Sequence, residues 1–404
     1  MTLKTLTTYG PAVTLPMKIN TRLPQAKRFL HIGVHNSANR NAGDTLLFPV
    51  VRKAFDAILG PCNWELRQAW ELFTLEDALR INSEFDGIVI GGGGLLLRDQ
   101  AGSDVTNSGW QWNSTVDAVK AIKKPIFVFA IGYNRFRGQE DFDPVFTNHI
   151  RALVTSSEFF GLRNTGSIDA LKHYLLPEQQ PILRRQFCPT NVLWQLFPEQ
   201  RALAQSHDAK LSRVLAFNAA FDRAHLRFGD NIDKVLMNLA QALITAQNRG
   251  WSIVVTAHKS IDRQIEPFLD RAGVNYETAD LTEAAPEEII AFYAQIDFAF
   301  GMRGHAQMIP FGLRRPIMSI ISHDKMRFLL EDIEHPDWGV EVDFGDLNER
   351  LDAALCAIET NRKAVLADVA VAQKKVWEET VNNLNAIANV LNPGDCLKGV
   401  SCPS

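Results

Sequence analysis

The sequence alternates short apolar runs with stretches of helical spacing, and it does so in two series. Apolar runs at 29–34, 85–90, 126–131 and 159–163 make up the first series. After a polar break near 198–212, a second series has runs at 214–218, 252–257, 296–300 and 316–321. Strands that alternate with helices predict a parallel sheet covered by helices. The double series therefore predicts an α/β fold of two Rossmann-like domains whose parallel sheets face a cleft.

The length of 404 residues supports this division, because one hydrophobic core seldom organises so long a chain. We expect an irregular leader over residues 1–28, an N-terminal Rossmann-like domain over 29–205 and a C-terminal Rossmann-like domain over 206–345. Residues 346–404 form an alanine-, lysine- and glutamate-rich helical region with a short tail. We expect this helix to pack back on the domains.

Composition narrows the class of protein. A hydrophobic content of 46% and a charged content of 22% are typical of a soluble globular chain, and a net charge of -4 argues against a nucleic-acid partner. No apolar run is long enough to span a membrane, and the N-terminus lacks the apolar core of a signal peptide. Five cysteines suggest neither a disulfide framework nor a zinc site. We expect a cytoplasmic protein without a metal; peripheral membrane association and oligomeric state stay open.

The segment 301–306, Gly-Met-Arg-Gly-His-Ala, lies between a predicted strand and a predicted helix. Arg303 and His305 are therefore expected at the carboxyl edge of a parallel sheet, where open α/β sheets bind ligands. The free amides of a helix's first turn favour anions, so the segment suits a phosphate or carboxylate with proton transfer nearby. Alternatively, Arg303 pairs with a carboxylate of the other domain and His305 caps a helix. Lys325, after the next strand, would add a charge to the same edge.

Two other strand ends carry similar side chains. Arg163 ends the run at 159–163 and precedes a predicted helix, in the same geometry as Arg303; the alternative is a surface ion pair. His258 follows the run at 252–257 and would serve as a general acid or sugar ligand, or as a capping or solvated residue.

Loops of the first domain supply further candidates. The glycines at 91–94 follow the strand at 85–90, and we expect Gly92 and Gly93 to let the backbone approach a substrate. They form neither a P-loop nor a dinucleotide fingerprint. Asn41 and Asp44 precede a predicted helix at 45–59, which tolerates its proline at position 49 only in the first turn. Asp44 is either a base on a substrate hydroxyl or the N-cap, and Asn41 suits sugar hydroxyls or a solvated turn.

These residues, in this order, resemble the polysaccharide pyruvyl transferase family over roughly residues 30 to 340. The resemblance implies a fold similar to GT-B glycosyltransferases. It also implies transfer of a pyruvyl group from phosphoenolpyruvate onto a sugar, usually as a ketal bridging two hydroxyls, with release of phosphate. The matching motifs are Asn-x-Gly-Asp at 41–44, the strand and glycines at 88–95, Gly132, Arg163 with Ser167, His258 with Asp262, Arg-x-His-Ala at 303–306, and Asp324-Lys325.

Carried over by position, the resemblance implies that Arg163 and Arg303 bind the phosphate and carboxylate of the donor. His305 would be the general acid that protonates the methylene carbon, and Asp44 is our candidate for the base. A trianionic donor needs several cations, and guanidinium forks match planar oxyanions. The donor is a substrate, so no cofactor is expected; the acceptor would be an oligosaccharide or a lipid-linked glycan.

The chain also departs from the family pattern. Gly304 replaces a larger apolar residue, Asn164 follows Arg163 where an acidic residue is frequent, and Cys188-Pro189-Thr190 stands where an aspartate follows proline. Two alternatives therefore stay open. One is a GT-B-type glycosyltransferase that uses a nucleotide sugar, although Glu287 and Glu288 are poorly placed for its ribose. The other is a non-catalytic relative that binds an anionic glycan.

Overall fold

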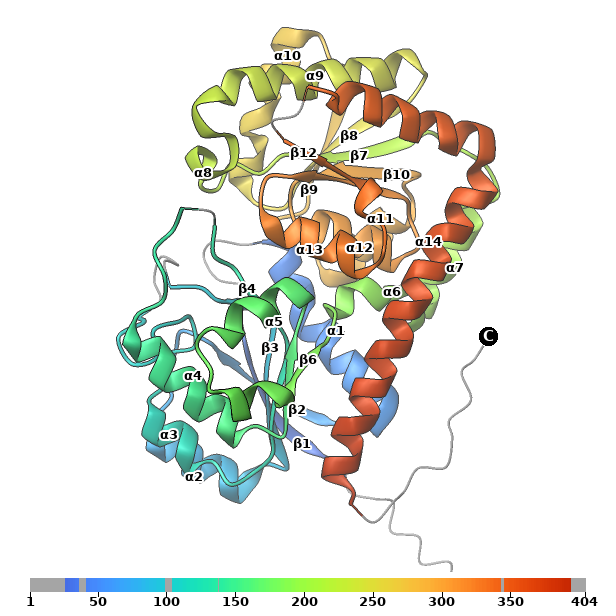
Figure 1. The fold of residues 1–404 in the computed structure, drawn as a ribbon. Helices are drawn as coiled ribbons and strands as arrows, with labels where there is room; N and C mark the ends of the chain where they lie inside the picture. The colour runs from blue at the N-terminus through green and yellow to red at the C-terminus, as the bar shows by residue number, and fades with distance from the viewer. Residues whose placement is uncertain (1–25, 36–40, 99–103, 137, 343–344, 394–404) are drawn as a thin grey trace, which may run out of the picture.

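A computed structural model describes residues 26–35, 41–98, 104–136, 138–342 and 345–393 (Figure 1). It contains two six-stranded sheets, ordered β2-β1-β3-β4-β5-β6 and β12-β11-β10-β7-β8-β9, in which every pairing is parallel. The predicted α/β class with two Rossmann-like sheets is confirmed. Most of the predicted leader and the tail from residue 394 lie outside the described residues.

The first sheet is built from residues 28–185, and helices pack on it. Its strands are β1 (Arg28–Gly33), β2 (Asn63–Gln68), β3 (Gly87–Leu96), β4 (Ile126–Tyr133), β5 (Phe159–Leu162) and β6 (Leu183–Arg185). The accompanying helices are α1 (Ala42–Leu59), α2 (Leu75–Glu84), α3 (Val116–Ala121), α4 (Pro144–Ser156) and α5 (Thr165–Lys172). The 3₁₀ turns η1 (Pro177–Ile182) and η2 (Pro189–Val192), with α6 (Leu193–Leu196) and α7 (Pro198–His207), lead to the second half.

The second sheet repeats this arrangement over residues 214–341. Its strands are β7 (Val214–Asn218), β8 (Ser252–Ala257), β9 (Tyr276–Asp280), β10 (Phe298–Gly301), β11 (Ile317–Ile321) and β12 (Gly339–Glu341). Its helices are α8 (Ala224–Phe228), α9 (Ile232–Asn248), α10 (Glu266–Ala272), α11 (Pro286–Ala294), α12 (His305–Gly312) and α13 (Asp324–Asp332). The turns η3 (Gly229–Asn231), η4 (Ser260–Ile265) and η5 (Pro336–Trp338) complete it.

Helix α1 begins earlier than its sequence suggested. Asn41 is the N-cap, and its side chain accepts a hydrogen bond from Gly43 N. The alternative in which Asp44 is the N-cap is therefore wrong, because Asp44 lies in the first turn. We had required Pro49 to lie in the first turn of α1, but it lies in the interior of the helix. Its cost of about 3 kcal/mol is offset because each of several large apolar side chains buried along α1 contributes about 1.5–3 kcal/mol.

Strand β3 does not end before the glycines, as predicted, but runs through them to Leu96. Gly91 pairs with Phe129 and Gly93 with Ile131 of β4. A Cβ on Gly91 would lie 2.0 Å from the Phe129 carbonyl oxygen, and φ at Gly91 is +141°. The glycines therefore allow β4 to approach β3 closely. The apolar run in the sequence did not reveal this role.

Helix α14 (Leu347–Leu391) joins the two halves. In Figure 1 it starts beside α9 and descends along one side of the molecule to the first sheet. Its backbone is non-helical at Asn361, where φ is -144° and ψ is 44°. Glu379 of α14 forms an ion pair with Arg185 of β6, with 2.5 Å between Oε2 and Nη2. None of the described helices combines the length and apolar character that crossing a membrane demands.

Candidate functional site

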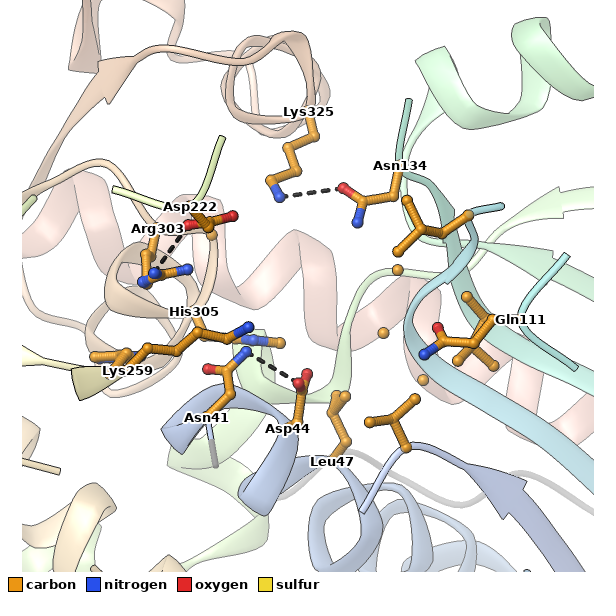
Figure 2. A pocket seen from close by; sticks show the side chains of 18 of the residues that line it. Asn41, Asp44, Leu47, Gln111, Asn134, Asp222, Lys259, Arg303, His305 and Lys325 are labelled. Carbon is orange, nitrogen blue, oxygen red and sulfur yellow. Dashed lines mark hydrogen bonds and ion pairs between the residues drawn. The ribbon is translucent and has the colours of Figure 1, made fainter. Parts of the chain in front are cut away.

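A cavity of about 460 Å³ lies between the carboxyl edges of the two sheets (Figure 2). Ligand sites typically have volumes of about 300–1,000 Å³. The structure brings every predicted site residue to this cavity, although their roles remain predictions. The nine are Asn41, Asp44, Gly92, Gly93, Arg163, His258, Arg303, His305 and Lys325.

Arg163 is a buried cation that forms no ion pair with another residue of the described part of the chain. Its side chain projects from the end of β5, and the residue is only 6% exposed. Its Nε and Nη2 atoms are buried and have no hydrogen-bond partner among the described residues. A Cβ on Gly132 would lie 2.0 Å from this Nε, so the glycine makes room for the guanidinium. Burial lowers the pKa of Arg163. A buried guanidinium with free donors is suited to bind an anion.

Arg303, in contrast, is already paired. Its Nε and Nη2 donate to the carboxylate of Asp262 at 2.6 and 2.5 Å, and Nη2 lies 2.9 Å from Asp222. Both acids follow strands of the second sheet, so the alternative of a carboxylate from the other domain is wrong. Burial opposes the charge, but the two carboxylates raise the pKa of Arg303 above its ordinary value. Because its charge is balanced locally, Arg303 contributes less to the field in the cavity than Arg163 does.

His305 is the first residue of α12, and its imidazole is closely packed. A Cβ on Gly43 would lie 2.0 Å from Nδ1, so the Asn-Ala-Gly-Asp segment leaves room for this ring. On another side, Nε2 lies 3.7 Å from the Sγ of Cys188, which in turn contacts Thr190 Oγ1 at 3.1 Å. Burial, Arg163, His258 and Lys325 lower the pKa of His305 to about 3. The imidazole is therefore neutral in the empty cavity at neutral pH.

Asp44 and Asn41 face the cavity from the first half. The Oδ2 of Asp44 accepts a hydrogen bond from Asn41 Nδ2 at 2.9 Å (Figure 2). Burial raises the pKa of Asp44, although Lys259, Asn41 and the site cations oppose this. A carboxylate with a raised pKa is a stronger base. Asp44 therefore lies where it can receive a proton from a ligand in the cavity.

Lys325 and His258 make different contacts at the cavity. Lys325, in the first turn of α13, donates from Nζ to Asn134 Oδ1 at 3.2 Å across the cavity (Figure 2). Burial, then Arg163 and Arg227, lower its pKa well below the ordinary value. His258 is fully buried, with Nε2 2.6 Å from the hydroxyl of Tyr293, and burial lowers its pKa to about 3. Its carbonyl accepts from Ala42 N, the first amide of α1, at 3.0 Å, so its backbone links the two halves. Its side chain is buried against Tyr293, so the alternative of a solvated residue is wrong.

Sequence reasoning missed several residues of the cavity. Asp222, Arg223 and Arg227 follow β7, and Asn134 follows β4, so the rule of strand ends would have found them. Lys259 follows β8 directly after His258, so the same rule applies to it, whereas Gln111 carried no comparable signal. Among the described lining residues, six cations face two carboxylates: Arg163, Arg223, Arg227, Lys259, Arg303 and Lys325 against Asp44 and Asp222. The cavity therefore favours a ligand with more than one negative charge.

The described part of the chain contains no group of three or more histidine, cysteine, aspartate or glutamate side chains placed to hold a metal ion. The charged and titratable groups that line the cavity are guanidinium, ammonium, imidazole and carboxylate groups. Such a set binds oxyanions and moves protons.

Comparison with known proteins gives a family and a fold. The family model for polysaccharide pyruvyl transferase matches residues 27–324, which confirms the resemblance seen in the motifs. No curated protein matches the sequence significantly. The structure is similar to that of MnaA from S. aureus with UDP (11% identity, TM-score 0.54, covering 91% of this chain and 97% of that one). It is also similar to a putative UDP-N-acetylglucosamine 2-epimerase from Listeria monocytogenes (11%, 0.54, 93% and 99%) and a glycosyltransferase from Rickettsia africae (12%, 0.52, 91% and 98%). At such low identity these neighbours show the GT-B-like fold alone.

Proposed function

The chain belongs to the polysaccharide pyruvyl transferase family, and we propose that it transfers a pyruvyl group from phosphoenolpyruvate onto a sugar of a polysaccharide or its precursor. The product would be a ketal, and phosphate would be released. The acceptor would be an oligosaccharide or a lipid-linked glycan.

The observation that carries this proposal is the unpartnered, buried guanidinium of Arg163 in a cavity rich in cations. Phosphoenolpyruvate presents a phosphate and a carboxylate on adjacent atoms, and it is close to a trianion at neutral pH. Arg163 would donate Nε and Nη2 to one of these groups in a two-pronged geometry. Lys325, across the cavity, would bind the other, and Arg303 would help to orient it.

The proposed reaction starts with protonation. His305 gives its proton to the methylene carbon of the donor, which turns the C2 atom into an electrophile. A sugar hydroxyl adds to C2 while Asp44 accepts the hydroxyl proton. The C2–oxygen bond to phosphate then breaks, and phosphate leaves with its electron pair. The second sugar hydroxyl adds to the same carbon and loses its proton, which closes the ketal.

The neutral state of His305 in the empty cavity supports an ordered sequence of events. Burial and, after it, Arg163, His258 and Lys325 hold the pKa of His305 at about 3, so the imidazolium that would donate the proton is absent at neutral pH. A bound trianion would neutralise these cations and favour the imidazolium. The imidazolium would thus form only when phosphoenolpyruvate is bound.

The test is a reaction of phosphoenolpyruvate with a panel of galactosides, glucosides and mannosides. Released phosphate is measured, and the products are examined by mass spectrometry. A product with the mass of the sugar plus pyruvate less one water supports the proposal, and His305→Gln should not form it. Turnover of a nucleotide sugar without reaction of phosphoenolpyruvate would instead identify a glycosyltransferase.

A further inference from the structure

A second cavity, of about 280 Å³, lies next to the first and shares Arg227 with it. It is formed by Phe136 from the first half, by the segment from α8 into α9, and by the residues after β11 and β12. The proposed reaction uses none of its other residues. Its position beside the donor cavity makes it available to a group that belongs to a second substrate or to a product.

His323 supplies the first indication of a ligand. It is 4% exposed and caps α13, where its Nδ1 accepts a hydrogen bond from Lys325 N at 3.4 Å. An accepting Nδ1 places the proton of the neutral ring on Nε2. This Nε2 is buried and has no hydrogen-bond partner among the described residues, although His323 lines the cavity. A buried donor left unsatisfied destabilises the structure, so a ligand that accepts a hydrogen bond here would remove this penalty.

The charges around the cavity indicate the sign of that ligand. Arg227 and Lys234 line it, and Arg227 is held in place by Ser322 at 2.9 Å and by Asp222 at 3.1 Å. Burial, followed by Lys325, Arg227, Arg163 and Arg223, holds the pKa of His323 well below its ordinary range, so its imidazole is neutral at neutral pH.

The start of α9 opens onto the same cavity and adds to its positive charge. No side-chain bond caps this helix of 17 residues at Asn231. Helix N-termini favour anions. Two acids also line the cavity, but Glu341 is already paired with Arg327 and Asp230 is exposed.

We propose that the second cavity binds a phosphoryl group. Its oxygens would accept a hydrogen bond from Nε2 of His323 and face Lys234 and the first turn of α9. Resting on the proposed function, the inference allows two sources: the phosphate of a phosphorylated sugar acceptor, or the inorganic phosphate that the reaction releases. The first source would make the acceptor a phosphorylated precursor and not a finished neutral polymer.

Equilibrium dialysis with radiolabelled inorganic phosphate on the full chain tests the proposal. We expect two equivalents bound by the parent and one by Arg163→Met, which empties the donor cavity. Lys234→Glu should also bind one, with an affinity for phosphoenolpyruvate within about twofold of the parent. Lys234 is exposed, so this change leaves folding intact. Lys210→Glu is the matched control, because Lys210 is exposed and outside both cavities; it should bind two.

A second measurement identifies the source of the phosphoryl group: glucose 1-phosphate or methyl glucoside competes with inorganic phosphate in the same dialysis. If the sugar phosphate competes for the second equivalent at least tenfold better than inorganic phosphate does, the acceptor is the source; equal competition identifies the released phosphate. A parent that binds a single equivalent, lost in Arg163→Met, would overturn the proposal. So would equal binding by Lys234→Glu and Lys210→Glu. Failure of the pyruvyl transfer itself would appear separately, as absent binding of phosphoenolpyruvate.

Discussion

Binding of phosphoenolpyruvate should take up a proton from solution. In the empty cavity the pKa of His305 is about 3, because of burial and of Arg163, His258 and Lys325. The proposed reaction needs the imidazolium. Donor binding must therefore raise this pKa across the working pH, and the proton must come from the buffer.

The magnitude is within reach of simple electrostatics. Raising the pKa of His305 from about 3 to about 7.5 requires about 6 kcal/mol. One negative charge about 4 Å from the ring contributes about 4 kcal/mol at an effective dielectric constant of about 20. Two charges of the donor at that distance therefore suffice.

The assay is titration calorimetry of phosphoenolpyruvate in several buffers with different ionisation enthalpies. At about pH 7.5 the donor phosphate is already mostly ionised, since its second pKa is about 6. The slope of observed heat against buffer enthalpy gives the protons taken up. We expect at least one for the parent and about one fewer for His305→Gln. If the parent takes up none, or if His305→Gln takes up as many as the parent, the reasoning about the general acid is wrong.

Three further predictions concern packing and stability. Gly43→Ala and Gly132→Ala should fold normally, since neither glycine has a positive φ. Both should nevertheless lose activity at least about 100-fold, because the new Cβ atoms would displace His305 and Arg163, respectively. Circular dichroism and phosphate release measure the two effects, with Gly345→Ala as the control because its Cβ would meet no atom within 4 Å. In urea unfolding, Arg163→Met should gain about 1–3 kcal/mol because it removes a buried charge that forms no ion pair with another described residue. Arg303→Met should lose about 3–5 kcal/mol, because buried Asp262 loses its cation and Asp222 keeps only Arg227; a loss in both variants would contradict the contrast. The free energy of unfolding should also fall as the pH drops below about 6.5, because buried histidines with a folded pKa near 3 stay neutral while the unfolded chain binds protons. Three such histidines together should lower the free energy of unfolding at pH 5.5 by about 4 kcal/mol relative to neutral pH. Equal urea midpoints at pH 7.5 and 5.5 would refute this. The three histidines are His31, His149 and His258.

The placement of the site was predictable because of a geometric rule. Arg163, His258, Arg303 and Lys325 all follow strands whose apolar runs are buried. In a parallel sheet the carboxyl ends lie at one edge, so residues far apart in sequence meet there. Two sheets that face each other bring both edges to one cavity, and this is why the nine residues lie together.

The edge strands were not predictable in the same way. Strands β2 and β9 have few or no buried residues, so neither shows the continuous apolar run that marks a buried strand. Their hydrogen-bonded neighbours β1 and β8, which are largely buried, were found. Period and apolar content report burial, and an edge strand has little of it.

The pairing of charges was also beyond the sequence. Arg163 and Arg303 occupy equivalent places after strands, but among the described residues Arg303 forms ion pairs with two acids and Arg163 with none. This difference depends on turns after β7 and β8 that orient Asp222 and Asp262 toward Arg303. Spacing along the chain does not reveal it, yet it decides which arginine is free to bind a ligand.

The most direct test of the central claim is the binding of phosphoenolpyruvate to the parent, to Arg163→Met and to Arg184→Met. Arg184 is an exposed arginine of β6 and serves as the matched control. We predict that the parent and Arg184→Met bind with equal affinity, while Arg163→Met, folded and at least as stable, binds at least about tenfold more weakly, since a charge-assisted hydrogen bond contributes about 1.5–3 kcal/mol. Equal binding by all three proteins, or no binding by the parent, would contradict the claim that this cavity is the donor site.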